Sequence, residues 1–218
     1  MLVEATSSLA YTRLGAERPE ALLVLLHGVG GNETQLEALA DDLDPRLAVV
    51  LPRGPLALGP ASFGWFNVVF SAEGPRIHPE QAEDSRLRLA DFLAGLQREL
   101  GVKPERTVLA GFSQGGIMSA SVGLTRPDLV RGFGLLSGRI LPEVLPSVAA
   151  PEALARLSAF VSHGTLDTKL PVSWAERSDR ILTELGVPFA SRRYAAGHLL
   201  NADMAADVRA WLHPLLFS

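Results

Sequence analysis

The 218-residue chain contains no cysteine. This absence excludes disulfide bridges, thiolate metal sites and a cysteine nucleophile. A catalytic nucleophile in this chain would have to be a serine, a threonine, a lysine or a carboxylate.

The chain also lacks an excess of charge of either sign. Lys and Arg number 20 and Asp and Glu number 24, which gives a formal net charge of −4, and the basic residues are scattered. A weakly acidic chain without a basic cluster has no electrostatic surface for nucleic acid, so we expect no nucleic-acid partner. Its 47% hydrophobic and 20% charged residues also exclude a disordered or collagen-like chain.

Long hydrophobic runs are missing as well. No window approaches the roughly 18 uncharged apolar residues of a membrane span. The N-terminal segment MLVEATSSLAYTRLG has neither the basic start nor the apolar stretch of a signal peptide. We therefore expect a cytoplasmic protein with no stable membrane insertion.

Short apolar runs alternate with segments of helical length. The clearest runs are ALLVLLH (21–27), LAVVL (47–51) and TVLAGF (107–112), and others cover 132–136, 158–162 and 187–194. They are continuously apolar, which predicts strands buried on both faces, as in a parallel sheet. Residues 3–11 are expected to add one or two antiparallel edge strands.

The intervening segments show helical patterns. Helices are predicted over residues 81–100, 114–125, 172–185 and 202–212, with Gly101 and Gly186 as C-caps of the first and third. This alternation predicts an α/β protein with a doubly wound, mostly parallel sheet. No repeat or linker interrupts the chain, so we expect a single domain over residues 1–218. Residues 53–77 lack periodicity and are expected to form a long functional loop.

The strongest local motif is Gly111-Phe112-Ser113-Gln114-Gly115, which fits the G-x-S-x-G nucleophile elbow. It has the required context, with an apolar strand before it and a helix after it. The serine of such a motif stands on a sharp turn, so small residues are needed two positions before and after it. The motif predicts Ser113 as a nucleophile, although such a turn can also serve only helix–strand packing.

A serine nucleophile needs a base and a group that orients the base. In an α/β sheet of this kind the chain order is Ser, Asp, His, with the base after the last strand. His198 follows the run that ends at Tyr194, and Asp167 follows the preceding strand in SHGTLD. We predict that His198 is the general base and Asp167 the orienting acid. The alternative is a loop histidine and a helix-capping aspartate.

The glycine-rich segment after the first apolar run resembles a loop that donates an oxyanion N–H group. It reads His27-Gly28-Val29-Gly30-Gly31, and we expect the N–H groups of Val29 and Gln114 to form the oxyanion hole. The His27 side chain is predicted to brace this loop, and His163 to pack beneath the turn of Asp167. The pattern G-x-G-x-x-G fails at Glu33, and no Walker or HExxH motif is present, so no cofactor and no metal are expected.

These residues together resemble the phospholipase/carboxylesterase family of small α/β-hydrolases, which includes the acyl-protein thioesterases and bacterial carboxylesterases. The matching segments lie in family order along nearly the whole chain: LLHGVGGNE (25–33), PRG to GWF (52–66), AGFSQGG (110–116), LLSG (135–138), SHGTLD (162–167), PVSWA (171–175) and AAGH (195–198). GFSQGG together with HGxxD is far more specific than G-x-S-x-G alone. The resemblance implies an α/β-hydrolase fold with a minimal cap domain or none.

The same resemblance implies Ser113, Asp167 and His198 as a catalytic triad. It also implies that Trp65 and Phe66 line the acyl side of the pocket, whereas the residues alone equally fit core aromatics that anchor the loop. One departure from the family pattern is Thr168-Lys169 after Asp167, where acyl-protein thioesterases tend to have an apolar residue. Lys169 is therefore a candidate substrate-binding residue that would disfavour a purely lipid-like acyl chain or attract an anionic one.

The resulting hypothesis is a serine carboxylesterase that hydrolyses small or short-acyl esters through an acyl-enzyme, with a small-molecule ester as its partner. Thioesterase, acyl-protein thioesterase and lysophospholipase activities use the same machinery and remain alternatives. A non-catalytic ligand-binding protein of hydrolase fold is the alternative of another class. The sequence leaves both a monomer and a homodimer open.

Overall fold

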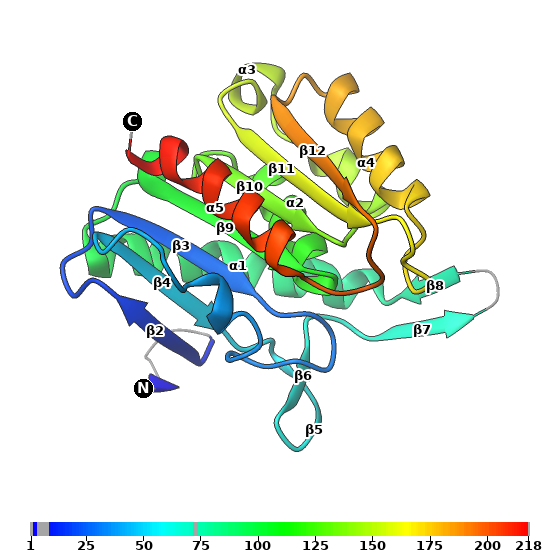
Figure 1. Ribbon diagram of the computed structural model, residues 1–218, viewed down its shortest axis with the longest axis horizontal. Helices are drawn as coiled ribbons and strands as arrows, with labels where there is room; N and C mark the ends of the chain where they lie inside the picture. The colour runs from blue at the N-terminus through cyan, green and yellow to red at the C-terminus, as the bar shows by residue number, and fades with distance from the viewer. Residues whose placement is uncertain (1, 4–8, 72–73, 218) are drawn as a thin grey trace.

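An eight-stranded sheet runs through the middle of the computed structural model, which describes residues 2–3, 9–71 and 74–217 (Figure 1). The strand order is β1-β2-β4-β3-β9-β10-β11-β12. The strands are β1 (Leu2–Val3), β2 (Tyr11–Gly15), β3 (Ala21–Leu26), β4 (Leu47–Pro52), β9 (Thr107–Phe112), β10 (Gly132–Leu136), β11 (Ser158–Gly164) and β12 (Phe189–Tyr194).

The pairing of these strands confirms the predicted doubly wound, mostly parallel sheet. Strands β4, β3, β9, β10, β11 and β12 are parallel neighbours, whereas β1 and β2 add an antiparallel edge beside β4. One or two antiparallel edge strands were expected within residues 3–11, and two are present. The second covers Tyr11–Gly15 and so lies later in the chain than expected. Residues 4–8 lie outside the described part of the chain.

Helices cover both faces of the sheet. They are α1 (Pro79–Leu100), α2 (Gln114–Thr125), the one-turn α3 (Pro151–Leu154), α4 (Ser173–Glu184) and α5 (Ala202–Phe217), with 3₁₀ turns η1 (Glu37–Leu39), η2 (Pro104–Arg106) and η3 (Pro142–Ser147). Helix α5 crosses in front of the sheet in Figure 1, and α1 lies behind it. The backbone at Gly101 and Gly186 has φ of 67° and 68°, the left-handed conformation expected of the glycines that end α1 and α4.

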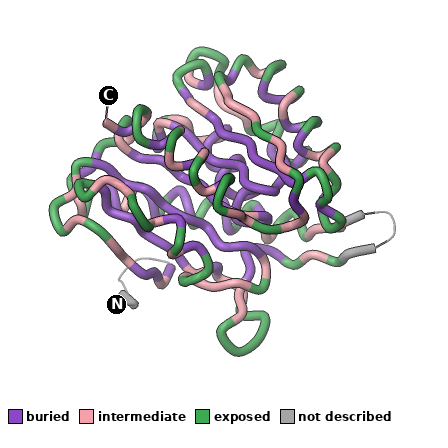
Figure 2. Tube along the Cα trace, in the orientation of Figure 1, coloured by how far each residue is buried: buried purple, intermediate pink, exposed green. Residues whose placement is uncertain are grey.

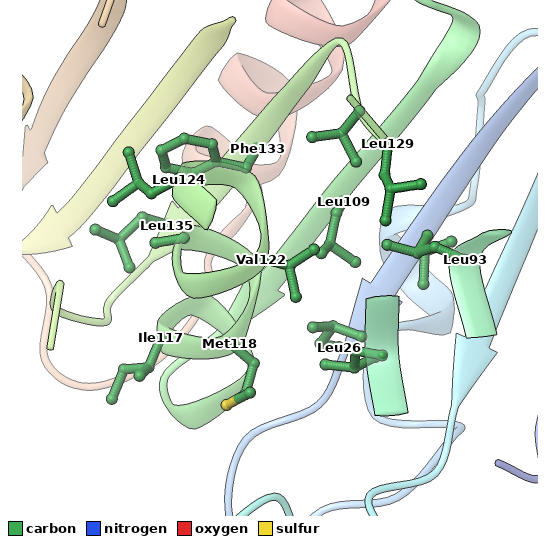
Figure 3. Close-up of a cluster of buried hydrophobic side chains, with 14 of the residues drawn as sticks. Leu26, Leu93, Leu109, Ile117, Met118, Val122, Leu124, Leu129, Phe133 and Leu135 are labelled. Atoms are coloured by element: carbon green, nitrogen blue, oxygen red, sulfur yellow. The ribbon is translucent and has the colours of Figure 1, made fainter. Parts of the chain in front are cut away.

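Two hydrophobic clusters lie on opposite faces of the sheet, and strand β3 shows why. Its Leu22, Val24 and Leu26 pack into the cluster with α1, α2 and α4, while Ala21, Leu23 and Leu25 pack into the cluster with α5. Figure 3 shows part of the first cluster, where Met118, Val122 and Leu124 of α2 approach the sheet. The central strands are buried along their length (Figure 2), which explains their continuously apolar sequence.

The region of residues 53–77 differs from the expected irregular loop. It forms two antiparallel hairpins, β5 (Leu56–Gly59) with β6 (Ser62–Gly64), and β7 (Val68–Ser71) with β8 (Gly74–Ile77). Residues 57–59 of β5 are exposed, so no hydrophobic alternation marks that strand in the sequence. Helix α5 also continues beyond the predicted Leu212 to Phe217, because Leu216 is buried against the sheet and holds the last turn in place.

In the described part of the chain, no helix combines the length and apolarity needed to cross a lipid bilayer.

Candidate active site

Ser113 lies on the turn between β9 and α2, with an unusual backbone conformation of φ 53° and ψ −115°. A positive φ is rare for a serine and marks local strain. The turn places Ser113 as the N-cap of α2, although its hydroxyl caps no backbone N–H of that helix. The hydroxyl is thereby free to point into the cavity that Ser113 lines.

The glycines of the motif make this turn sterically feasible. A Cβ on Gly111 would lie 2.4 Å from the backbone of Gly115, and a Cβ on Gly115 would lie 2.0 Å from the carbonyl oxygen of Leu26. Any side chain at these two positions would push α2 away from β9 and β3. The need for small residues around Ser113 is therefore a packing requirement of the turn itself.

The structure brings the predicted base and acid to Ser113. The Nε2 atom of His198 lies 2.9 Å from the Ser113 Oγ, and its Nδ1 lies 2.6 Å from Oδ2 of Asp167. Ser113 follows β9, Asp167 follows β11 and His198 follows β12. These strands and β10, which lies between β9 and β11, are parallel neighbours and end at the same edge of the sheet. Because Asp167 can only accept when ionised, Nδ1 carries the proton and Nε2 faces the hydroxyl as an acceptor.

Asp167 is held in a fixed orientation. Its Oδ1 accepts hydrogen bonds from the backbone N–H groups of Lys169 (2.9 Å) and Leu170 (2.8 Å), and its side chain is fully buried. These two bonds leave Oδ2 for His198. The chain turn after β11 therefore aims the carboxylate at the imidazole.

His163 lies beneath this turn, as expected. Its Nε2 donates to the carbonyl oxygen of Leu170 at 2.7 Å and lies 3.4 Å from Oδ2 of Asp167. Burial lowers the pKa of His163, while the Leu170 carbonyl and Asp167 oppose that shift. His163 thus supports the turn from below as a buried neutral ring.

The glycine-rich segment after β3 is braced in the predicted way. His27 donates from Nδ1 to the Gly28 carbonyl oxygen (2.7 Å), and its Nε2 accepts the N–H of Gly54 (2.8 Å). The segment is also paired with the hairpin β5–β6, because Gly30 donates to the Phe63 carbonyl oxygen and Phe63 donates to that of Gly31.

Val29 and Gln114 border the same cavity as Ser113. As the first residue of α2, Gln114 has a backbone N–H without a partner in its own helix. Outside the helices and strands, no backbone acceptor within the described residues takes the N–H of either Val29 or Gln114. These two N–H groups are therefore available to a ligand beside Ser113.

The side chain of Gln114 has a second task that the sequence did not reveal. Its Oε1 accepts the N–H of Trp65 and its Nε2 donates to the carbonyl oxygen of Phe66, both at 2.7 Å. The Trp65 carbonyl oxygen also accepts the Ser85 hydroxyl at 2.5 Å. The residue after the nucleophile thereby fixes residues 65 and 66 next to the site.

A cavity of about 880 Å³ opens at Ser113, large enough for both halves of a small ester. Phe66 and Lys169, two predicted substrate-binding residues, line it. Trp65 does not, so that prediction is wrong: the side chain is fully buried and its Nε1 donates to the His27 carbonyl oxygen. The cavity is also lined by residues that the sequence analysis did not single out, among them Ile117, Arg139 and Trp174.

A serine on a strand–helix turn, with an acid and a histidine from the ends of later strands, is the arrangement of α/β-hydrolases. The sheet order and the two helical layers agree with that class. The fold and the site together therefore define an α/β-hydrolase.

Comparison with known proteins specifies the family. The family model described as phospholipase/carboxylesterase matches residues 10–215. Acyl-protein thioesterase 1 of Emericella nidulans is 30% identical over 202 residues, which cover 80% of this chain and 82% of that protein. The chain belongs to the phospholipase/carboxylesterase family, and it is an ester-hydrolysing enzyme.

Solved structures show the same fold. A carboxylesterase from Mesorhizobium loti superimposes with a TM-score of 0.83, at 24% identity and with 97% of each chain covered. Esterase PE8 superimposes with a TM-score of 0.80, at 29% identity, covering 95% of this chain and 99% of that one.

Proposed function

We propose that the protein is a serine carboxylesterase that hydrolyses small or short-acyl esters through an acyl-enzyme. The observation that carries this proposal is the continuous hydrogen-bonded chain from Ser113 through His198, both of which line the cavity, to Asp167. Nucleophile, base and orienting acid are already within hydrogen-bonding distance of one another, as the reaction requires.

In the proposed reaction the Ser113 Oγ attacks the ester carbonyl carbon while Nε2 of His198 takes the hydroxyl proton. The carbonyl oxygen becomes an oxyanion, which the backbone N–H groups of Val29 and Gln114 stabilise together with the N-terminus of α2. His198 then gives its proton to the departing alcohol oxygen. A water molecule, deprotonated by His198, releases the acid from the acyl-enzyme in the second half of the reaction.

Asp167 stabilises the imidazolium that forms in both halves. Its buried carboxylate keeps the proton of His198 on Nδ1 and so leaves Nε2 as the base. The backbone hydrogen bonds from Lys169 and Leu170 hold this carboxylate in place. No part of this sequence of steps needs a cofactor.

Replacement of the nucleophile tests the proposal directly. We expect Ser113→Ala to lower kcat for ester hydrolysis by roughly 10⁴- to 10⁶-fold and to abolish labelling by a fluorophosphonate probe. Ser137→Ala is a matched control, because Ser137 also has a positive φ (49°) but is fully buried and lies outside the cavity. Labelling that persists in Ser113→Ala would disprove the assignment of Ser113 as the nucleophile. If the folded wild type formed no adduct with the probe, a non-catalytic ligand-binding protein would be favoured.

The preference for short acyl chains follows from the polar and charged groups at the mouth of the cavity. Exposed Thr168 and Lys169 line it beside the apolar Phe66, Ile117 and Trp174, so part of the cavity wall is polar. We expect kcat/KM to be greatest for acyl chains of about four carbons or fewer and to fall with longer chains. Initial rates on a series of acyl esters measure this, and a preference for long chains would contradict it.

Thioesterase activity is the second candidate, because curated relatives such as those of Emericella nidulans and Gibberella zeae are acyl-protein thioesterases. Thioesters and lysophospholipids would use the same Ser113, His198 and Asp167. Rates on an ester and a thioester with the same acyl group separate the two activities. Faster turnover of the thioester would favour the second candidate.

A further inference from the structure

A buried cation borders the cavity and is not used by the reaction described above. Arg139 is 7% exposed and lines the same cavity as Ser113. Among the described residues, no carboxylate lies within salt-bridge distance of it, and its Nε has no hydrogen-bond partner. Its Nη2 donates a long hydrogen bond of 3.3 Å to the carbonyl oxygen of Pro75.

The surrounding structure holds Arg139 in a fixed place. Its guanidinium carbon lies 4.4 Å from the centre of the Trp174 ring, and Trp174 lines the cavity as well. The Ser178 hydroxyl links the two segments, because it accepts the N–H of Ile140 and donates to the carbonyl oxygen of Trp174. The guanidinium is therefore fixed against α4 before any ligand arrives.

Arg139 is also connected to the nucleophile turn. It follows β10 by three residues, and the last residue of β10, Leu136, accepts the N–H of Ser113 at 2.8 Å. A Cβ on the intervening Gly138 would lie 2.9 Å from the Ser113 carbonyl oxygen. Close packing thus keeps the backbone leading to Arg139 against the nucleophile turn.

A buried guanidinium without a carboxylate partner among the described residues is unfavourable for the empty protein. Arginine is rarely so buried without a carboxylate, and among the residues that the structure describes its desolvation is compensated by an aromatic face and one carbonyl oxygen. Burial lowers the pKa of Arg139, with Arg177 acting in the same direction and Glu143 opposing it. The described residues that line the cavity include two cations, Arg139 and Lys169, and no carboxylate.

We propose that Arg139 binds a carboxylate of the substrate, so that the enzyme prefers esters that carry a second, free carboxylate. This inference rests on the proposed esterase function and specifies its substrate class. Guanidinium nitrogens present a planar fork that matches a carboxylate, and a buried pair of this kind is strong and little screened by salt. Lys169 is exposed and therefore contributes long-range attraction more than affinity.

The test compares each charged substrate with a neutral substrate of the same shape. Monoethyl succinate, glutarate and adipate are paired with the ethyl esters that end in a carboxamide. A second pair, the butyrate esters of 4-hydroxybenzoate and 4-hydroxybenzamide, places the charge on the alcohol part. We expect wild-type kcat/KM to favour the carboxylate in at least one of these pairs, and equal rates throughout would overturn the inference.

Variants then show whether Arg139 is the source of the preference. Arg139→Met should lower the ratio of kcat/KM for the charged over the neutral ester by about 30-fold or more. Arg139→Lys should retain part of the ratio, because it keeps the charge but loses the fork. Lys169→Met should change the ratio by no more than about fivefold.

Arg177→Met is the matched control. Arg177 faces the same Trp174 ring at 5.7 Å, but it is exposed and does not line the cavity, so its loss should leave the ratio unchanged. A ratio that falls as much in Arg177→Met as in Arg139→Met would overturn the inference. The inference would also be overturned if Arg139→Met kept the wild-type ratio, because Arg139 would then have a purely structural role.

Two readouts keep this test separate from that of the esterase function. Fluorophosphonate labelling reports Ser113 in every variant that retains this serine. Calorimetric titration of glutarate into Ser113→Ala reports binding without turnover. Labelled enzyme without any carboxylate preference would overturn this inference alone. If glutarate binds to Ser113→Ala but not to the double variant Ser113→Ala/Arg139→Met, the carboxylate site is supported even if no ester is hydrolysed.

Discussion

Gly115 is the residue at which the nucleophile turn tolerates least change. A Cβ there would lie 2.0 Å from the carbonyl oxygen of Leu26 and 2.6 Å from that of His27. Both neighbours are backbone atoms at the end of a central strand, so neither can rotate away. We expect Gly115→Ala to lower the free energy of unfolding by about 3 kcal/mol or more and to reduce fluorophosphonate labelling, as measured by urea unfolding and by labelling rate.

Gly95 provides the control for that prediction. It lies inside α1, and a Cβ there would meet no atom within 4 Å. Gly95→Ala should therefore stabilise the protein by about 0.5–1 kcal/mol through helix propensity. Similar losses in the two variants would mean that glycine-specific packing at the turn is not what matters.

The meeting of Ser113, Asp167 and His198 could be predicted because motif, chain order and strand position all point to one edge of the sheet. The roles of Trp65 and Arg139 could not. Whether an aromatic ring faces a cavity or the core depends on packing and hydrogen bonds in the folded chain, here the bond from Trp65 to the His27 carbonyl oxygen. An arginine in a sequence gives no sign of whether a carboxylate will lie near it.

At the scale of elements, the parallel strands were predictable because each is buried on both faces and so reads as an unbroken apolar run. Strand β9 and helix α2 begin and end at the predicted residues. The hairpins of residues 56–64 and 68–77 were missed because short strands without hydrophobic alternation, such as the exposed residues 57–59, leave no pattern in the sequence. The contacts that place residues 63, 65 and 66 beside the site join residues distant in the sequence. Phe63 pairs with Gly31, and Gln114 holds residues 65 and 66, contacts that no local pattern encodes.

These distant contacts attach the hairpin β5–β6 to the site. It is joined to the segment that carries Val29 through hydrogen bonds between Phe63 and residues 30 and 31. The chain that follows it is joined to the nucleophile turn through the Gln114 side chain. The region expected to be a long functional loop is thus part of the frame that positions both candidate oxyanion donors.

At the scale of the whole molecule, two buried histidines link stability to pH. His27 would lose its hydrogen bond from Gly54 if Nε2 were protonated, and His163 has a buried Nδ1 without a partner in the described structure. Burial lowers the pKa of both rings below 6.5. Glu33 raises the pKa of His27, and Arg53 lowers it. Asp167 raises the pKa of His163, and Arg193 and His198 lower it.

A histidine with a lowered folded-state pKa binds its proton more readily when the chain is unfolded. Its contribution to stability is therefore complete above the unfolded pKa near 6.5 and is lost as the pH falls toward the folded pKa. We expect the free energy of unfolding to fall as the pH is lowered from 7.5 to 5.5, with a limiting slope of about 1.4 kcal/mol per pH unit for each ring.

Urea unfolding at half-unit steps of pH measures this slope in the wild type and in His27→Gln. The variant should be less stable at pH 7.5, because it loses the hydrogen bonds of His27 to Gly28 and Gly54. The slope of its unfolding free energy against pH should be smaller by up to about 1.4 kcal/mol per pH unit, which is the contribution of one proton. The difference between the two curves, rather than either curve alone, isolates His27 from the carboxylates that titrate at lower pH. Parallel curves would show that His27 takes up its proton equally in the folded and unfolded chains, which its burial between two backbone groups argues against.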